Sequence, residues 1–279
     1  MNFFIMKHKI LAVMVIGVLL PGMVRGQEKT GRDTLQCHIV GFSFGAVTPL
    51  AGSNSGGVAG GNMKDLYQGP YLDFALEWDY KFKSNWMLSL DGDLWFGYNS
   101  DNLQLRVERM GDIFTSQGYM MSMGGKDGVV TLYNRGLAVR PGIGKIIPFF
   151  KKNPDSGLLL KLSGGWFMQK TVQTQDMNEG AVPQLSDKMM PLYDHLRNGV
   201  ILTQSVGFIF MSNRSTYVNF KVTFDLSECF SWSSRPYIID KVMGLNGKDD
   251  NTYFDLMGGV KLSWMFPFTG KTSYDYYYY

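Results

Sequence analysis

Residues 71–82 read Tyr-Leu-Asp-Phe-Ala-Leu-Glu-Trp-Asp-Tyr-Lys-Phe, and every even position is large and apolar or aromatic. The odd positions include Asp73, Glu77, Asp79 and Lys81. Because successive side chains of a strand point to opposite faces, this alternation predicts a β-strand with one apolar and one charged face.

The same period of two recurs along the chain and predicts eight strands in all. Two further segments repeat it strongly, Thr216–Leu226 and Tyr253–Phe268. Weaker copies cover Val40–Val47, Trp86–Tyr98, Val130–Ile147, Leu158–Gln169 and Val200–Met211. The alternation changes phase near Arg135, which predicts a β-bulge at that point.

The connections between these segments are alternately short and long. The short ones are residues 83–85, 150–157 and 212–215. The long ones cover about 48–69, 99–129, 171–199 and 228–252. This alternation is typical of an up-and-down barrel in a bacterial outer membrane, which has tight periplasmic turns and extended external loops.

A soluble eight-stranded barrel is the competing interpretation, because it would also have a period of two. The apolar face carries aromatic residues toward the strand ends, where membrane barrels place rings at the bilayer interface. The expected interface aromatics are Trp78, Tyr80, Phe82, Trp86, Trp264, Phe266 and Phe268 on the periplasmic side, with Tyr98 and Trp166 on the outer side. A soluble barrel would crowd these rings into a narrow lumen. The sequence therefore predicts an all-β, eight-stranded antiparallel up-and-down transmembrane β-barrel.

The polar face is expected to line the lumen with charges of both signs. These residues are Asp73, Glu77, Asp79, Lys81, Asp91, Asp93, Arg140, Lys161, Lys221, Asp225, Asp255 and Lys261. Side chains can fill an eight-stranded interior, and buried charges persist when they are paired. We expect a salt-bridged plug. A narrow ion path is the alternative, although a selective pore usually has one sign of charge along its wall.

The first 26 residues predict a secretory signal peptide. Lys7 and Lys9 precede the apolar run Ile10–Leu20, and cleavage is expected before Gln27. The run is too short to span a bilayer. The expected domains are the signal peptide 1–26, the outer-membrane barrel 27–268 and a Tyr-rich periplasmic tail 269–279. The expected location is therefore the Gram-negative outer membrane.

Composition excludes two classes of protein. Aromatic residues at 14% and charged residues at 18% are inconsistent with a disordered chain. Removing Lys7, Lys9 and Arg25 with the signal peptide reduces 27 basic residues to 24, which equals the 24 acidic residues. A nucleic-acid binder would carry a basic surplus, so none is expected as a partner.

The sequence offers little for catalysis. His38 and His195 are expected on opposite sides of the membrane, where they cannot cooperate, and Cys37 and Cys229 are likewise too far apart for a disulfide. We therefore expect free thiols, no enzyme activity, and neither a metal site nor a cofactor. An enzyme built around His195 is a distant third hypothesis for the function.

Several short stretches together resemble small outer-membrane β-barrel proteins of Bacteroidota. They are 140–145 (Arg-Pro-Gly-Ile-Gly-Lys), 153–157 (Asn-Pro-Asp-Ser-Gly), 182–185, 193–199, Ser234-Arg235 with Asp240, and the Tyr-rich end. Barrels of this kind include accessory proteins of type IX secretion and of barrel assembly. The resemblance implies a larger envelope complex, with membrane lipid, the barrel-assembly machinery and an unidentified envelope protein as partners.

The sequence therefore predicts a structural or complex-forming component of the envelope, with a lumen filled by side chains. The alternative is a narrow porin-like channel for ions or small solutes.

Overall fold

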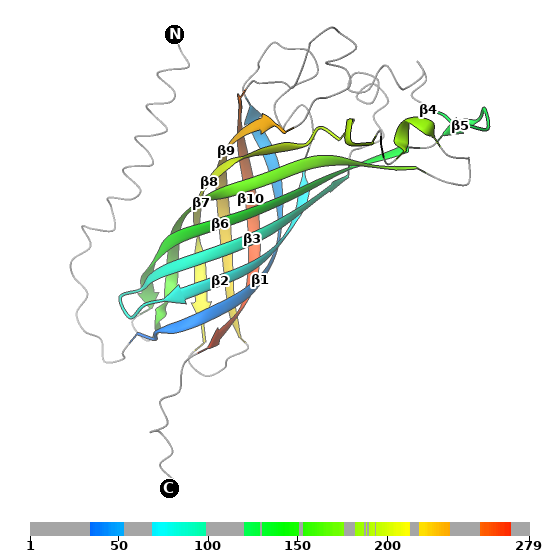
Figure 1. Ribbon diagram of the computed structural model, residues 1–279. Helices are drawn as coiled ribbons and strands as arrows, with labels where there is room; N and C mark the ends of the chain where they lie inside the picture. The colour runs from blue at the N-terminus through cyan, green and yellow to red at the C-terminus, as the bar shows by residue number, and fades with distance from the viewer. Residues whose placement is uncertain are drawn as a thin grey trace.

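The computed structural model describes residues 34–52, 69–98, 120–128, 130–150, 153–175, 182–186, 188, 190–192, 194–212, 218–234 and 252–268. Within these residues, eight long strands close into one antiparallel barrel in the order β1-β10-β9-β8-β7-β6-β3-β2 (Figure 1). The strands are β1 (Cys37–Gly52), β2 (Tyr71–Lys81), β3 (Trp86–Tyr98), β6 (Val130–Phe150), β7 (Asn153–Gln175), β8 (Arg197–Met211), β9 (Asn219–Ser233) and β10 (Thr252–Phe268). The predicted fold class is confirmed.

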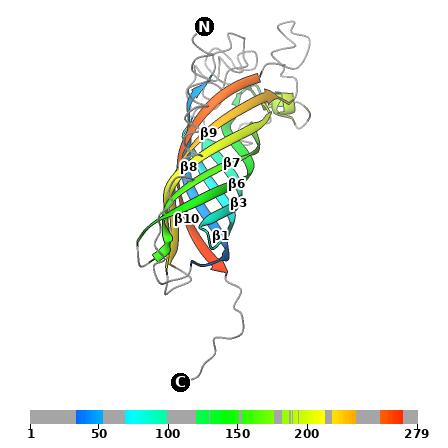
Figure 2. The ribbon, with the colours of Figure 1, turned by 90° about the vertical axis from the view of Figure 1, so that its left-hand side faces the viewer.

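All eight predicted strands are present, and most are longer than the alternating segments that predicted them. Figure 2 shows the strands strongly tilted along the length of the barrel. β6 and β7 have 21 and 23 residues and stay paired from Phe150↔Asn153 to Val130↔Gln175. This ladder therefore continues beyond the end of the β3–β6 pairing at Tyr98↔Tyr133.

The bulge predicted near Arg135 is wrong. Arg135 pairs with Phe96 and with Lys170 in unbroken register. The register shifts lie between Pro49 and Ala51 and between Pro148 and Phe150, where a residue without a backbone N–H interrupts the ladder. At Arg135 the alternation is interrupted because a cation occupies an outward position next to the apolar residues Leu137 and Val139.

The short turns and the long connections lie at opposite ends of the barrel. In the β2–β3 turn, Phe82 N donates to Trp86 O at 2.9 Å, and Asn85 has a φ of 61°, a region that asparagine tolerates. Asn85 Nδ2 donates to Pro154 O at 2.9 Å and so links this turn to β7. We call this end the inner end and the opposite end the outer end.

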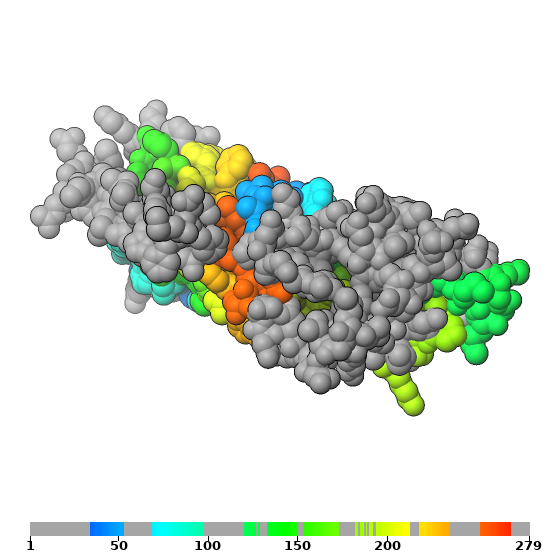
Figure 3. Space-filling model, turned by 90° about the horizontal axis from the view of Figure 1, so that it is seen from above, coloured from blue at the N-terminus to red at the C-terminus, as the bar shows by residue number. Residues whose placement is uncertain are grey.

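Short elements lie in the long connections at the outer end. The strands β4 (Met120–Met121) and β5 (Asp127–Gly128) form a hairpin, and two 3-10 turns cover η3 (Pro183–Leu185) and η4 (Met190–Leu192). In the view from above, the green hairpin lies at one extreme of the molecule (Figure 3). Met120 is buried, whereas Met121 and Met123 are 51% and 78% exposed.

The outward face of the barrel is apolar. Its large exposed residues include Phe42, Phe44, Phe74, Leu76, Leu88, Leu90, Val139, Ile143, Val206, Phe224, Val260, Leu262 and Trp264. Glu228 of β9 is an acid at an outward position, like Leu226 and Phe230 of the same strand. It accepts a hydrogen bond from Gln204 Nε2 at 3.5 Å. None of the helices that the structure describes is long and apolar enough to cross a membrane.

The apolar exterior predicts that a charged substitution on it lowers the stability of the barrel. Phe224 is 65% exposed in the outward row of β9, and Phe224→Arg is expected to reduce the free energy of unfolding by about 2–4 kcal/mol because a cation there contacts hydrocarbon. Phe224→Leu should change it by about 1 kcal/mol or less. Urea unfolding in phospholipid vesicles measures both variants. Equal stability would contradict contact between this face and lipid.

A sealed and charged lumen as the candidate functional site

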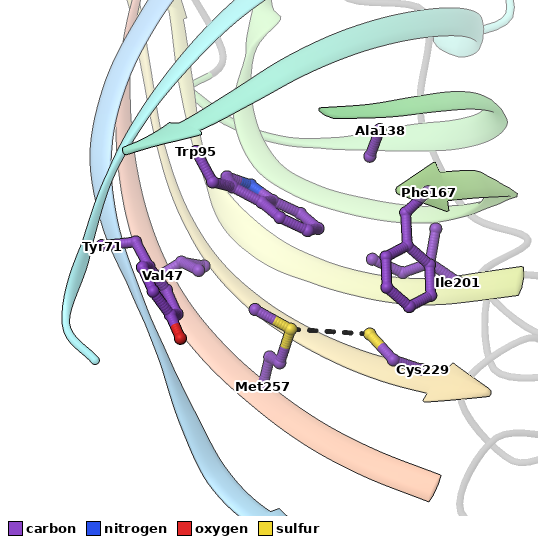
Figure 4. Packing of buried hydrophobic residues seen from close by; sticks show 8 residues of the cluster. All are labelled: Val47, Tyr71, Trp95, Ala138, Phe167, Ile201, Cys229 and Met257. Atoms are coloured by element: carbon purple, nitrogen blue, oxygen red, sulfur yellow. Dashed lines mark hydrogen bonds between the residues drawn. The ribbon is translucent and has the colours of Figure 1, made fainter. Parts of the chain in front are cut away.

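An apolar ring closes the outer part of the lumen. Each barrel strand contributes one buried residue: Val47, Tyr71, Trp95, Ala138, Phe167, Ile201, Cys229 and Met257. We call this ring the outer seal. Figure 4 shows its side chains converging on the bore, with the Cys229 Sγ and Met257 Sδ atoms 3.6 Å apart. The Trp95 and Phe167 ring centroids are 6.2 Å apart.

Glycines make room for the three aromatic side chains of the outer seal. A Cβ atom on Gly136 would lie 2.5 Å from Trp95 Cε3, and one on Gly199 would lie 2.5 Å from Phe167 Cε1. A Cβ on Gly97 would overlap the Tyr71 ring in the same way. Each ring therefore lies over a glycine of the neighbouring strand, which lets large side chains fill a narrow bore.

A second apolar cluster closes the inner part of the lumen. Its buried members are Cys37, Ile39, Met87, Ile146, Leu159, Ile209, Met211 and Met265, and we call it the inner seal. Met87 lies eight residues from Trp95 along β3, and Ile146 lies eight residues from Ala138 along β6. Eight residues of a tilted strand correspond to a separation of about 20 Å along the bore.

The inner seal contains no residue from β2 or β9. Asp79 of β2 and Lys221 of β9 occupy the corresponding positions. Each lies eight residues along its strand from an outer-seal residue, Tyr71 or Cys229. The Lys221 Nζ and Asp79 Oδ2 atoms are 3.3 Å apart, and both side chains are buried. This ion pair completes the inner ring.

Between the two seals lies a layer of buried charges. It contains Asp73, Glu77, Asp91, Asp93, Arg140, Lys161, Asp225 and Lys261, and the pair Asp79–Lys221 borders it. These are ten of the twelve charges expected in the lumen. These ten charges comprise six carboxylates and four cations. Two of the cations, Lys221 and Lys261, therefore each contact more than one carboxylate.

Lys261 is the most shared cation. Its Nζ lies 2.8 Å from Asp73 Oδ2 and 3.8 Å from Asp225 Oδ2, and it also contacts Asp93 Oδ1. Asp93 is also held by Arg140, with Nη2–Oδ1 at 2.7 Å and Nε–Oδ2 at 2.9 Å. The guanidinium and the ammonium therefore share three carboxylates between them.

The remaining cations of the layer have short, direct partners. Lys221 Nζ lies 2.6 Å from Glu77 Oε2, and Lys161 Nζ lies 2.6 Å from Asp91 Oδ2. Arg140 Nη1 also donates to Thr203 Oγ1 at 2.7 Å. Since burying an unpaired charge is costly, this pairing is what allows the layer to exist.

Two of the twelve expected lumen charges lie outside the seals. Lys81 is buried at the inner end, where its Nζ lies 2.6 Å from Asp155 Oδ1 and donates to Leu35 O at 2.9 Å. Asp155 also accepts a hydrogen bond from Leu35 N at 3.0 Å, so this pair holds the start of the barrel. Asp255 is buried in β10 on the outer side of the outer seal.

Most of the expected interface aromatics lie at the inner end. Tyr80 and Phe82 have ring centroids 4.8 Å apart, as do Trp264 and Phe266. The Lys145 Nζ lies 5.0 Å from the Trp86 ring centroid. The other members there are Trp78 and Phe268, which are 42% and 59% exposed.

The two aromatics expected on the outer side are Trp166 and Tyr98. Trp166 is 41% exposed beside the outer seal. Tyr98 ends β3, and its side chain lies outside the described residues.

The histidines and cysteines are separated along the barrel. His38 lies at the inner end, 4.7 Å from the Tyr80 ring centroid, whereas His195 precedes β8 at the outer end with a φ of 47°. Cys37 belongs to the inner seal and Cys229 to the outer seal, and both are free thiols. Among the described residues, no group of His, Cys, Asp or Glu side chains is arranged to hold a metal ion.

The seals themselves were missed by the sequence analysis, although the sequence carries a signal for them. Alternation gives way to unbroken apolar runs at 94–96, 158–160 and 166–168, so both faces of the strand are apolar there. The middle residue of each run, Trp95, Leu159 or Phe167, belongs to a seal.

An apolar outer face around a charge-paired interior, closed by strands without a free edge, defines a class of protein. The chain is an integral β-barrel of the outer-membrane type.

Comparisons with known proteins add only distant likenesses. No known family and no curated protein matches the sequence. The chain is similar to the crystal structure of Ail, the attachment invasion locus protein of Yersinia pestis, with a TM-score of 0.34, 12% identity, and coverage of 84% of this chain and 100% of that one.

Neisserial surface protein A has a TM-score of 0.30 and 10% identity, with coverage of 80% of this chain and 95% of that one. The Pseudomonas putida toluene transporter TodX has a TM-score of 0.19 and 7% identity, with coverage of 86% and 92%. At these values the likenesses assign neither a family nor a role to this chain.

The charge layer predicts that the stability of the barrel depends strongly on Lys261. Lys261→Met leaves Asp73 and Asp225 without their cation, and the free energy of unfolding should fall by about 3–5 kcal/mol. Adding Asp73→Asn is expected to restore part of this loss, because one carboxylate becomes neutral. Lys83→Met, at an exposed turn position, is the control and should change stability by about 0.5 kcal/mol or less. Urea unfolding that ranks the two single variants equally would contradict the network.

Proposed function

We propose that this protein resides in the outer membrane as a barrel with a filled lumen, and acts through its surfaces as a structural or complex-forming component of the envelope. The observation that carries this proposal is the pair of seals on either side of a salt-bridged charge layer. A solute in the bore would have to displace two apolar rings and separate ion pairs between them. The interior is therefore suited to holding the barrel together.

The charge pattern supports the plug over the ion path. Each cation of the layer lies within 2.8 Å of a carboxylate oxygen, so the wall presents salt bridges rather than one sign of charge. The apolar rings add a further barrier, because a hydrophobic constriction stays dry.

The surfaces left for function are the ends of the barrel. At the outer end, the β4–β5 hairpin exposes Met121 and Met123, and flexible thioether side chains adapt well to partner surfaces. At the inner end, Phe149 is 65% exposed beside the β6–β7 turn. The resemblance to small barrels of Bacteroidota supports the same role, with an envelope protein as partner and the barrel-assembly machinery required for insertion.

The filled lumen predicts an electrically silent barrel. The folded mature protein in a planar lipid bilayer is expected to give no unit conductance steps, because both seals are closed. A large-pore porin prepared in the same detergent is the control for insertion. Reproducible steps from the folded protein would favour the narrow channel instead.

The proposed complex predicts specific cross-links in intact envelopes. A photo-reactive residue at Met123 or at Phe149 is expected to give a discrete protein adduct from at least one end of the barrel. Affinity purification and mass spectrometry then identify the partner. If both variants fold and neither yields a discrete adduct, the complex-forming role is wrong.

A further inference from the structure

Two cations in the outward row of β6 flank a run of apolar residues. This part of the row reads Arg135, Leu137, Val139, Pro141, Ile143 and Lys145. Ten residues at about 3.3 Å each, tilted by about 40°, span about 25 Å, which is the height of the apolar band of such barrels. If Lys145 lies at the headgroups of one leaflet, Arg135 lies at those of the other.

A second cation lies beside Arg135. Lys170 of β7 is its direct register partner, on the same outward face. Like charges directly opposite each other in a sheet are destabilising. Among the described residues, neither cation forms an ion pair with a carboxylate, and their outward neighbours Phe96, Leu137 and Met168 are uncharged. An anion bound between the two cations would turn this repulsion into attraction.

The Arg135 guanidinium is held in place on the lipid-facing side. Its Cζ atom lies 5.0 Å from the Phe96 ring centroid and 5.2 Å from the Tyr133 ring centroid. Its Nη1 donates to Asn134 O at 3.1 Å. Because these contacts hold the guanidinium in place, its remaining N–H groups form a fixed fork. This geometry suits the oxygens of a phosphate.

We propose that Arg135 and Lys170 form a binding site for a phosphate group of lipid A in the outer leaflet. The inference rests on the proposed location of the barrel in the outer membrane. Two adjacent cations match a phosphate monoester, which carries a charge of about −1.5 to −2 at pH 7. The phosphodiester of a glycerophospholipid carries one charge and has two substituted oxygens, so it fits the pair less well.

The test measures lipid binding to the whole folded mature protein. The wild type, Arg135→Gln/Lys170→Gln and Lys145→Gln are purified in a zwitterionic detergent and titrated with bisphosphorylated lipid A, and native mass spectrometry counts the bound lipid. The double variant should bind about tenfold more weakly or worse, as expected for lost charge-assisted hydrogen bonds. Lys145→Gln is the matched control, since it removes a cation that lies over Trp86 and donates to Ser84 O at 2.6 Å. It should bind like the wild type.

Two further probes identify the source of the phosphate. Enzymatically dephosphorylated lipid A and phosphatidylglycerol should both bind the wild type about tenfold more weakly than bisphosphorylated lipid A. Equal binding of lipid A by the double variant and the wild type would overturn the site. Equal binding of phosphatidylglycerol and lipid A would overturn the assignment to lipid A. A wild type that stays folded without detergent would overturn the proposed function itself, and the two failures are therefore distinguishable.

Discussion

The structure depends on the pairing of charges inside a closed ring of strands. Hydrocarbon outside the barrel provides no hydrogen-bonding partner, so the backbone must pair with itself all the way around. This closure traps the polar face of every strand in a narrow bore. Asp93 can remain ionised there because Arg140 and Lys261 approach it from β6 and β10. The same contacts tie together strands that are far apart in the sequence.

Such ties constrain register as well as charge. Lys221 of β9 reaches Glu77 of β2, and two strands lie between them in the ring. A one-residue slip of either strand would turn its charged row toward lipid and its apolar row into the bore. Ion pairs across the lumen therefore favour one register of the whole barrel. Their role here is to specify the structure, since paired buried charges often contribute little net stability.

The two seals separate this interior from both aqueous compartments. The outer seal uses large rings over glycines, and the inner seal uses aliphatic and sulfur-containing side chains completed by the Asp79–Lys221 pair. With the bore closed at two levels, recognition falls to the ends of the barrel and to its lipid-facing side. Arg135 and Lys170 belong to that side and lie where the β6–β7 ladder leaves the apolar band.

The sequence by itself determined the barrel, because a period of two is a local property of each strand. Tyr71–Phe82 assigns its apolar and charged faces without reference to any other segment, and the alternating loop lengths give the antiparallel order. Only the tertiary structure decided which charges meet, where the bore closes and why Arg135 breaks the pattern. Those facts depend on strand tilt and on the stagger between neighbours, which bring Trp95, Phe167 and Met257 to one level. Stagger is a property of the closed ring, and the sequence of a single strand does not contain it.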